Sequence, residues 1–434
     1  MFLVYLEMMR SSEDGMFKRL VAILVVGLCV NVACTSPAQG RSAVQSQRGT
    51  ALATPSASAT PGGLPSPTPQ PPDTPTAVSG VDVAAIQLLS PKVGFATAFF
   101  GPPFGLLKTT DGGGTWRRLG TPASHIESIR FIDEDIGWLV GSIVREGTSL
   151  SCQQAAPVSV PACRGVVLRT QDGGRTWETL LSVPSDFVAG NPVRQLQAVD
   201  GQRAWVLVKV ASGCDGYGCG ELRGTIDGGR TWTKLGGANI IAIRFASAAQ
   251  GWMASQEAGG PVAISSTSDG GRTWTNRFVT GARRLVDLDA ASTSTAWVLT
   301  VDPLSCTGSS CLNYELLRTT DSGQSWHHLG NPKSGTGACT IGQLDGPFFA
   351  SPQRGWLPIN RGAGGAVVEA GHLATEDGGL TWSCAATPAN TVLASPADPQ
   401  HWWITAWGAH GTVASIYSTS DGGAHFELLR LDVP

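Results

Sequence analysis

An eight-residue motif, called the octapeptide below, occurs seven times in this chain of 434 residues and constrains its fold more than any other feature. Its second copy, TQDGGRTW, runs from Thr170 to Trp177. Successive copies lie about 40 to 60 residues apart, a period typical of β-propeller blades. The repeat therefore predicts an all-β fold, a seven-bladed β-propeller of four-stranded antiparallel blades. The central aspartates of the copies are Asp111, Asp172, Asp227, Asp269, Asp321, Asp377 and Asp421.

The residue types of the octapeptide suit a tight turn. Every copy has Thr two residues before the Asp and Gly two residues after it. The Asp can accept hydrogen bonds from N–H groups of the turn, and glycines permit left-handed backbone angles that other residues resist. We therefore expect the octapeptide to join the third and fourth strands of each blade, strands C and D, as a structural device and not as a repeated active site.

Two sets of aromatic residues recur in register with the octapeptide. Large in-register rings usually form core, so we expect both sets to lie between the layers of the fold, with a carbohydrate-binding platform as the alternative. The first set, five residues after each Asp, is Trp116, Trp177, Trp232, Trp274, Trp326, Trp382 and Phe426. The second, expected in strand B, is Phe95, Trp138, Trp205, Trp252, Trp297, Trp356 and either Trp402 or Trp403.

The fourth repeat displays the expected strand pattern best. Its four apolar stretches, predicted as strands A to D, are residues 240–245, 251–254, 262–267 and 274–279. The composition, with 55 Gly, 27 Pro and 15% charged residues, suits many short strands joined by turns.

The N-terminal residues resemble an export signal. A basic start after Met16 precedes an apolar run over residues 20–30, and the sequence Val-Ala-Cys ending at Cys34 resembles a bacterial lipoprotein processing site. We expect residues 1–33 to be a signal peptide, with translation starting at Met16 and lipidation at Cys34. Because Asn31 occupies a position that is usually aliphatic, a plain cleaved signal and an uncleaved anchor remain alternatives.

Residues 34–80 are rich in Pro, Ser and Thr and contain few large apolar side chains. Such a segment cannot bury enough surface to fold, so we expect an extended linker that holds the propeller, residues 81–434, away from a membrane. The chain is then expected to be secreted across the cytoplasmic membrane and lipid-anchored at its outer face, on the cell surface or in the periplasm.

Eight cysteines follow the linker, and an even number in an exported chain predicts disulfides. Six form close sequence pairs: Cys152 with Cys163, Cys214 with Cys219, and Cys306 with Cys311. Cys339 and Cys384 are paired by elimination. Zinc at Cys214 and Cys219 is the competing interpretation, but no neighbouring His completes a ligand set.

The three local cysteine pairs lie in expected inserts between strands B and C, at residues 142–165, 210–221 and 302–314. In a four-stranded antiparallel blade, B–C and D–A connections leave one face and A–B and C–D connections leave the other. The inserts should therefore lie opposite the octapeptides. Because variable loops on a rigid scaffold carry function, we expect a ligand or partner on the insert face.

The octapeptide is similar to the Asp box, or bacterial neuraminidase repeat, of sialidases, sortilin-type receptors and xyloglucanases. Together with an upstream Gly-aromatic pair in the repeats and the lipoprotein-like start, it most resembles the Ycf48/Hcf136 class of photosystem II assembly factors and their non-photosynthetic relatives. This resemblance covers residues 81–434 and implies a non-enzymatic scaffold for protein binding or assembly. The fold itself serves many unrelated functions.

A sialidase-like glycoside hydrolase or a glycan-binding propeller is the alternative function. A sialidase needs an arginine triad, a Tyr nucleophile with a Glu partner and an acid/base carboxylate, and we cannot assemble that set. The adjacent residues Tyr314 and Glu315 on an expected strand would point to opposite sides of a sheet. Xyloglucanases resemble two such propellers around a groove, and this chain has one. We therefore expect no enzymatic activity.

Arg130, Arg244 and Trp407 are the candidate binding residues. The two arginines occupy matching places in strand A of the second and fourth repeats, where they could attract an acidic partner segment or stack on aromatic rings. Trp407 is an aromatic residue outside both in-register sets. A membrane or envelope protein is favoured as the partner over a glycan.

The remaining charged features favour no cofactor. The two histidines His327 and His328 alternate sides on a strand, which is poor geometry for one metal, and the acidic residues 133–135 fit a solvated turn better than a weak calcium site. The net charge of −3 gives no basic field for nucleic acid. We expect a monomer without cofactor or metal.

Overall fold

All of the regular structure that the computed structural model describes is β. Residues 1–82 lie outside the described residues, so the signal peptide, Cys34 and the linker remain predictions. None of the described residues forms a helix long and apolar enough to cross a membrane. The described ranges are 83–98, 105–120, 122–144, 163–184, 192–209, 220–237, 239–257, 260–281, 284–302, 313–332, 334–336, 343–344, 346–360, 371–386, 390–407 and 414–429.

Four of the sheets contain four antiparallel strands each, in sequence order. The first consists of β1 (Val83–Leu88), β2 (Gly94–Ala98), β3 (Leu106–Thr109) and β4 (Arg117–Gly120). The second consists of β5 (His125–Phe131), β6 (Gly137–Val144), β7 (Cys163–Thr170) and β8 (Glu178–Pro184). The other two consist of β17 (Arg284–Ala290), β18 (Ala296–Val301), β19 (Tyr314–Thr319) and β20 (His327–Gly330), and of β27 (Asn390–Pro396), β28 (Trp402–Trp407), β29 (Ala414–Thr419) and β30 (Glu427–Leu429).

Two larger sheets complete the described part. One joins two four-stranded units through a single pairing between Gly220 and Ile240. Its units are β9 (Val193–Ala198), β10 (Ala204–Lys209), β11 (Gly220–Thr225) and β12 (Thr233–Lys234), and β13 (Ile240–Phe245), β14 (Gly251–Gln256), β15 (Val262–Thr267) and β16 (Thr275–Val279). The other sheet contains β21 (Ser334–Thr336), β22 (Gln343–Leu344), β23 (Phe348–Phe349), β24 (Gly355–Asn360), β25 (Gly371–Thr375) and β26 (Trp382–Ala386).

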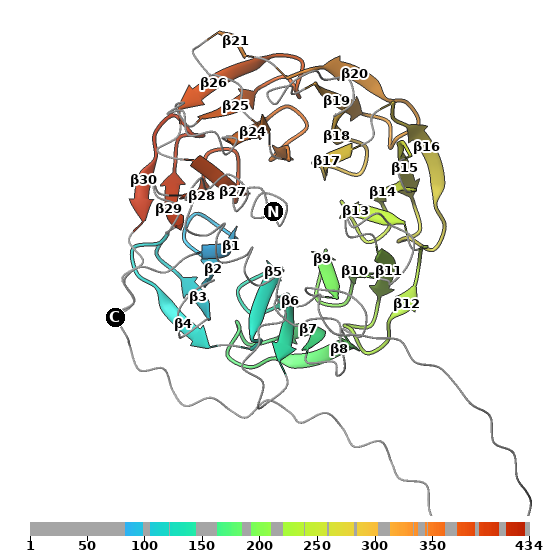
Figure 1. The fold of residues 1–434 in the computed structure, drawn as a ribbon. Helices are drawn as coiled ribbons and strands as arrows, with labels where there is room; N and C mark the ends of the chain where they lie inside the picture. Colours follow the sequence, from blue (N-terminus) through green and yellow to red (C-terminus); the bar gives the residue numbers. More distant parts are fainter. Residues whose placement is uncertain are drawn as a thin grey trace, which may run out of the picture. The chain divides into compact units, whose positions relative to one another are not determined.

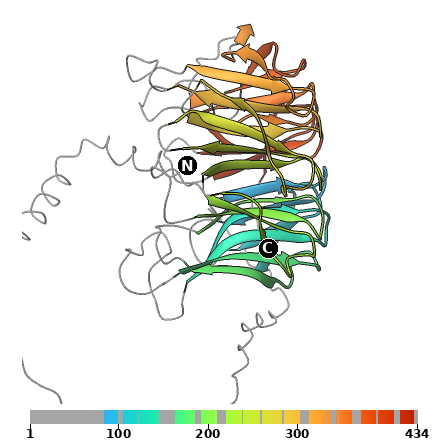
Figure 2. The same cartoon turned by 90° about the vertical axis from the view of Figure 1, so that its right-hand side faces the viewer.

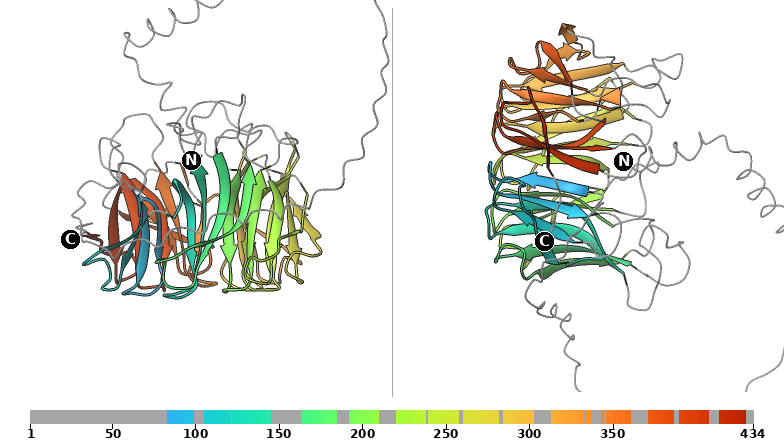
Figure 3. Two further views of the ribbon diagram at one scale, coloured as in Figure 1. Left: turned by 90° about the horizontal axis from the view of Figure 1, so that it is seen from below. Right: turned by 90° about the vertical axis from the view of Figure 1, so that its left-hand side faces the viewer.

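The sheets are arranged around a common axis, with the first strand of each four-stranded unit innermost (Figure 1). Each innermost strand lies beside the next, from β1 to β5, β9, β13, β17 and β23, and β27 returns to β1. Figures 2 and 3 show the strands running between two opposite faces. This is a β-propeller of four-stranded antiparallel blades, and its ring closes between β27 and β1.

Buried side chains on the innermost strands connect neighbouring blades. Gln87 on β1 accepts a hydrogen bond from Phe131 N on β5 (2.7 Å) and donates one to Phe131 O (2.8 Å). At the closing junction, the hydroxyl of Ser395 on β27 accepts a hydrogen bond from Leu88 N (2.9 Å). These bonds satisfy buried backbone groups at sheet edges that would otherwise lack partners.

The octapeptide forms the same turn in every copy. In the second copy, the Thr170 hydroxyl donates to one oxygen of Asp172 (2.8 Å), and Thr176 N donates to the same oxygen (2.9 Å). The Thr176 hydroxyl donates to the other oxygen (2.6 Å), and the Thr170 hydroxyl oxygen accepts from Gly174 N (2.9 Å). Both carboxylate oxygens are therefore engaged inside the turn, which makes the motif a structural device.

The left-handed backbone angles of the octapeptide explain its glycines. Gly173 and Gly174 have φ values of 73° and 89°. The fifth copy has Ser322 in place of the first glycine, and Ser322 still adopts a φ of 63°. Its hydroxyl donates to Thr293 O (3.1 Å), a local contact that accompanies the less favourable conformation.

Hydrogen bonds also place the octapeptides on the face of the A–B turns. Gly173 N donates to Asp135 O in the turn between β5 and β6 (2.9 Å), and Gly228 N donates to Gln202 O in the turn between β9 and β10 (2.9 Å). We call this the octapeptide face. Cys163 is at the start of β7, and the expected B–C inserts otherwise lie almost entirely outside the described residues.

Rings from the two aromatic sets meet between sheets. Trp116 lies 5.4 Å from Trp403 across the junction of β1–β4 with β27–β30, and Trp232 lies 6.5 Å from Trp138. Trp403 pairs with Ser395 and so occupies the strand B position, whereas the preceding Trp402 stands where most blades have Gly or Ala. The second set is buried throughout, as expected for core.

Strand β21 is an addition to the four-stranded plan. It follows β20 in the chain but pairs in parallel with the outer edge of β26, where Thr336 lies opposite Ser383. The neighbouring Cys384 is disulfide-bonded. Cys339, three residues beyond Thr336, lies outside the described residues, so its pairing with Cys384 remains a prediction.

Replacing Asp172 by Ala is expected to lower the free energy of unfolding by about 1 to 2 kcal/mol, because the turn loses several hydrogen bonds to the carboxylate. Urea unfolding of the purified protein measures this change. Glu427→Ala, at an exposed position of β30 outside any octapeptide, is the control. An unchanged midpoint in Asp172→Ala, with loss of partner binding, would reverse the structural assignment of the octapeptide.

Candidate functional site

The innermost strands carry a polar residue, or in one case Phe, at one matching position, directly opposite the aromatic residue of the second strand. This position immediately precedes the last residue of each innermost strand, next to the A–B turn. Arg130 and Arg244, identified in the sequence, both occupy it, opposite Trp138 and Trp252. The full set is Gln87, Arg130, Gln197, Arg244, Asp289, Phe348 and Ser395.

Arg244 is neutralised by the next blade. Its Nε donates to Leu288 O (3.1 Å) and lies 3.3 Å from Asp289 Oδ1, while Nη2 lies 4.0 Å from Asp287 Oδ2. Burial lowers the pKa of Arg244, but Asp289 and Asp287 oppose this effect and raise its pKa overall. Arg244 therefore connects two blades, which is a structural role.

The two aspartates differ in their surroundings. Asp289 accepts a hydrogen bond from Phe349 N through its second oxygen (2.6 Å), so it joins Arg244 to the blade beyond. Burial raises the pKa of Asp287, although Arg244 and the N–H of Leu288 act in the opposite direction. A side chain at Gly346 would overlap the Asp287 carboxylate from its Cβ onward, so glycine is needed there for close packing.

Arg130 has a different environment. It makes no hydrogen bond or ion pair with any of the described residues, and its side chain is accessible to solvent. Surrounding protein lowers the pKa of Arg130 by desolvation, and the Arg244 charge lowers it further. Arg130 therefore presents the five N–H donors of a guanidinium to a ligand that carries a carboxylate or another oxyanion.

Residues other than Arg130 and Arg244 stack on the aromatic rings of the second strands. The cations over the strand B rings are Lys108 over Phe95 (5.4 Å), Arg169 over Trp138 (5.6 Å) and Arg318 over Trp297 (5.6 Å). All three lie on third strands. From the sequence, Arg130 and Arg244 could either stack on a ring or bind a ligand. Only the tertiary structure shows which residue covers each ring.

Arg130 and Arg244 lie near the octapeptide face, because each precedes the last residue of a strand that leads into an A–B turn. We expected the binding surface on the insert face instead. The two lines of sequence reasoning thus lead to opposite ends of the innermost strands. Of the expected inserts, residues 145–162, 210–219 and 303–312 lie outside the described residues.

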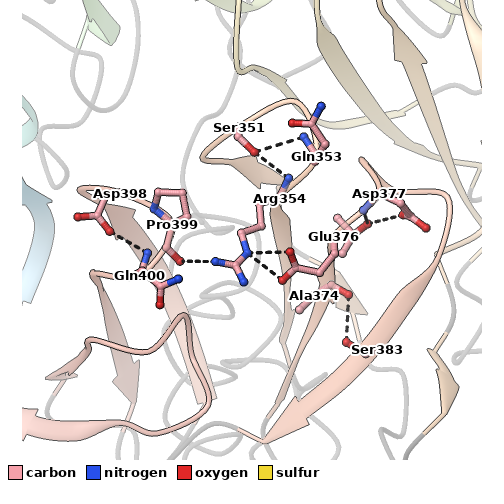
Figure 4. Close-up of polar contacts among 11 residues, drawn as sticks. Ser351, Gln353, Arg354, Ala374, Glu376, Asp377, Ser383, Asp398, Pro399 and Gln400 are labelled. Carbon is pink, nitrogen blue, oxygen red and sulfur yellow. Dashed lines mark hydrogen bonds and ion pairs between the residues drawn. The ribbon is translucent and has the colours of Figure 1, made fainter.

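Other polar contacts on the octapeptide face join blades. Arg354 Nε lies 2.8 Å from both carboxylate oxygens of Glu376, and Nη1 donates to Pro399 O in the next A–B turn (3.4 Å; Figure 4). The Glu376 side chain is 70% exposed, so solvent weakens this ion pair. The arrangement orders two turns and leaves no free guanidinium.

The remaining sequence candidates are placed as follows. Trp407 ends β28 and pairs with Asn390, but its side chain lies outside the described residues, as do the side chains of all the cysteines after the linker except Cys384. His327 and His328 are both exposed, and His328 Nδ1 lies 2.5 Å from Glu315 Oε1. Within the described ranges, no group of three or more His, Cys, Asp or Glu residues is arranged to hold a metal ion.

The acidic turn and the tyrosine have structural contacts. Asp133 accepts hydrogen bonds from Asp135 N (2.9 Å) and Ile136 N (2.7 Å), which makes an ordinary turn. Tyr314 is buried, and its hydroxyl oxygen accepts a hydrogen bond from Leu344 N (2.9 Å). A buried tyrosine bound to backbone is poorly placed to attack a sugar.

A second charged cluster was not found from the sequence. It consists of His125, Glu127, Arg194 and Lys209, at the opposite end of the innermost strands from Arg130. These residues are scattered over more than eighty positions, and no spacing rule connects them.

Comparisons with known proteins support the fold. No protein-family model matches the chain, and no curated protein matches it in sequence. It is similar to the GH74 enzyme of Niastella koreensis, with a TM-score of 0.53 and 15% identity over 80% of this chain and 54% of that one. It is also similar to the β-propeller domain of the Trilobed protease from Pyrococcus furiosus, with a TM-score of 0.53 and 5% identity over 81% and 98% of the two chains.

A structure of YCF48 bound to a D1 peptide is a further neighbour, with a TM-score of 0.49 and 18% identity over 77% of this chain and 95% of that chain. The chain spans about half the length of the GH74 enzyme. At these identities the comparisons define a β-propeller and assign no activity.

Proposed function

We propose that this chain is an extracytoplasmic β-propeller of seven blades that binds a protein partner and has no enzymatic activity. Seven octapeptides, each folded as the same turn, support the number of blades. The apolar run after Met16 and the residues around Cys34 support export and lipid anchoring at the outer face of the cytoplasmic membrane. A Pro-rich linker then gives the propeller reach toward membrane or envelope proteins.

The observation that carries the binding function is the guanidinium of Arg130. Polar groups at matching positions, such as Gln87, Asp289 and Ser395, are hydrogen-bonded to the next blade, whereas Arg130 has no partner among the described residues. An unpaired, partly desolvated guanidinium is suited to one carboxylate, because planar bidentate pairing with Arg is geometrically matched. The partner is therefore an acidic segment or a chain terminus of a protein.

An assembly role is supported by the resemblance of the octapeptide and lipoprotein-like start to the Ycf48/Hcf136 class. The buried position of Tyr314 weakens a sialidase-like mechanism. Turnover of a sialoside or a glucan by the purified protein, lost on mutation of a single carboxylate, would replace the scaffold function with an enzymatic one. In an organism without photosystem II, the general assembly role remains and the photosystem-specific one does not.

Replacing Arg130 by Gln is expected to reduce recovery of the partner about tenfold or more, because a charged hydrogen-bond pair contributes about 1.5 to 3 kcal/mol. Cross-linking and co-purification from native membranes, followed by mass spectrometry, measures recovery and identifies the partner. The melting temperature should remain unchanged, since Arg130 holds no described contact.

Arg175→Gln is the matched control for this experiment. Arg175 is an exposed arginine on the octapeptide face whose Nη1 donates only to Asp172 O (3.1 Å). The Arg175→Gln variant should recover the same partner, in the same amount, as the wild type. Equal recovery by Arg130→Gln and the wild type would remove Arg130 from the binding site.

A further inference from the structure

A buried guanidinium near the octapeptide face has no hydrogen bond. Arg169 on β7 is 7% exposed and lies over the Trp138 ring. Its Nε is fully enclosed and has no partner, and its Nη1 and Nη2 donate to none of the described residues. Polar groups at this depth are almost always paired, because water no longer compensates for a missing hydrogen bond. Arg169 therefore lacks an acceptor that the described part of the chain does not supply.

The equivalent cations of two other blades do have acceptors. Lys108 and Arg318 also lie opposite a strand B ring on third strands, and both reach the A–B turn of the next blade. Lys108 Nζ donates to Glu134 O (3.1 Å). Arg318 donates from Nη2 to Pro352 O (3.2 Å) and from Nη1 to Asp377 O (3.3 Å). The missing acceptor is thus particular to the blade formed by β5 to β8.

The neighbouring Arg230 explains part of this difference. It follows Asp227 by three positions in the third octapeptide, and its Nη1 donates to Asp227 O (3.1 Å), the carbonyl that corresponds to Asp377 O. The sixth octapeptide has Leu380 at this position, which leaves Asp377 O to Arg318. Repulsion between like charges opposes a second guanidinium on the same carbonyl.

Arg169 and Arg230 are close enough for their charges to interact. Burial lowers the pKa of Arg169, and the Arg230 charge lowers it further against the effect of Glu178. Glu178 lies opposite Arg169 on β8, but its side chain is exposed and forms no ion pair with Arg169. A Cβ at Gly228 would lie 2.9 Å from Arg169 Nη1, so the guanidinium reaches the turn that carries the exposed Arg230. The two arginines therefore offer unused N–H donors at one turn.

Arg130 and Arg169 lie in one row across the same blade. Arg130 on β5, Trp138 on β6 and Arg169 on β7 are direct cross-strand partners. Cross-strand partners project from the same side of an antiparallel sheet. Neighbouring strands are about 4.8 Å apart, so the backbones of the two arginines are separated by about 10 Å. An extended or polyproline-like chain covers this distance with about three residues.

We propose that Arg169 and Arg230 bind a second carboxylate of the partner segment whose first carboxylate is bound by Arg130. This inference rests on the proposed function and specifies its ligand, an extended acidic segment with two carboxylates about three residues apart. Planar pairing of guanidinium with carboxylate gives each position its geometric specificity.

Fluorescence anisotropy of labelled peptides with the full-length protein in detergent tests this spacing. All peptides share one Pro- and Ser-rich sequence that keeps them extended, and they carry one Glu, two Glu residues three positions apart, or two Glu residues directly adjacent. The peptide with the three-position spacing is expected to bind at least tenfold more tightly than the other two.

Arg169→Met and Arg230→Gln should each reduce this preference at least fivefold. Arg272→Gln is the matched control, because Arg272 holds the same place in the fourth octapeptide, with Nη1 on Asp269 O (3.1 Å). It should retain the full preference. Weaker binding by Arg130→Gln, without any effect of spacing or of Arg169→Met, would refute the second carboxylate position and leave the proposed function intact. If Arg130→Gln also binds every peptide as the wild type does, both proposals fail.

Thermal melting separates a ligand contact from a structural role of Arg169. A buried guanidinium without acceptors destabilises a fold, so Arg169→Met, which keeps a long side chain over Trp138, should melt at the wild-type temperature or above it. A lower melting temperature together with unchanged peptide binding would make Arg169 a structural residue and overturn the proposal.

Discussion

Replacing Trp297 by Ala is expected to lower the free energy of unfolding by about 3 to 5 kcal/mol. Trp297 on β18 is fully buried and stacks on Phe349 of the next blade, with ring centroids 3.5 Å apart and planes 2° apart. Its Nε1 donates to Gly378 O (2.9 Å), and Arg318 covers its ring. The substitution therefore leaves a large cavity at a junction between two blades.

Equilibrium unfolding in urea measures this loss. Trp297→Phe retains a ring against Phe349 but leaves Gly378 O without the indole N–H. The lost hydrogen bond is expected to lower the free energy of unfolding by about 1 kcal/mol, in addition to the effect of the smaller ring. Val279→Ala is the control, since Val279 is 50% exposed, and it should change stability by less than about 0.5 kcal/mol. A loss in Trp297→Ala no greater than that of Val279→Ala would contradict the junction as a source of stability.

His372 is expected to make the protein acid-sensitive. It is 3% exposed on β25, lies edge-on to Trp402 (5.5 Å) and Phe426 (6.2 Å), and its Nδ1 has no hydrogen-bond partner among the described residues. Burial lowers the pKa of His372 from 6.5 to about 4. The neutral ring is favoured in the fold, so stability is complete above the unfolded pKa and falls as the pH drops toward the folded pKa.

The free energy of unfolding is expected to fall by about 3 kcal/mol between the unfolded and the folded pKa of His372, because each unit of pKa shift corresponds to about 1.4 kcal/mol. Urea unfolding from about pH 7.5 to about pH 4 measures it. His372→Phe should abolish this fall and retain full stability at neutral pH, since it places an apolar ring among aromatic neighbours and removes the unpaired nitrogen. If His372→Phe shows the same fall as the wild type, His372 is not its source.

The stability that the octapeptide aspartates contribute should fall only at a lower pH than the stability that depends on His372. Burial raises the pKa of the octapeptide aspartates, most strongly at Asp172 and Asp377. Hydrogen bonds from the residue four positions later lower the pKa by more, so the net shift is downward. Because the folded pKa is below the unfolded one, the stability they contribute is present above about pH 4 and is lost below it. The pKa is about 2 for Asp111, Asp227, Asp269, Asp321 and Asp377.

Local features of the fold followed from the sequence because they depend on residues close together in the chain. The strands predicted in the fourth repeat at 240–245 and 262–267 coincide with β13 and β15, and the strand predicted at 251–254 extends to Gln256. The hydrogen bonds of the octapeptide span four residues, so the order of Thr, Asp and Gly encodes them directly. Ring closure at β27 and β1 depends on distant residues and was not predicted.

The candidate site was only partly accessible from the sequence. Arg130 and Arg244 occupy equivalent positions, and nothing in their local sequence separates them. The structure separates them because Asp287 and Asp289, on the following blade, neutralise Arg244, whereas the residues around Arg130 provide no such carboxylate among the described ones. Bulges in the innermost strands β1, β5, β9, β13, β17 and β27 also change the strand register that a sequence pattern assumes.

The sequence by itself determined the repeat, the turn at each octapeptide and the aromatic core, since short-range hydrogen bonds and the alternation of strand residues fix them. Only the tertiary structure decided which charges are paired, because pairing on the innermost strands joins residues of neighbouring blades that are more than forty positions apart. The tertiary structure also placed Arg130 at the octapeptide end of the ring and the second charged cluster at the other end. The direction of each strand, and not its composition, sets the end at which a side chain lies.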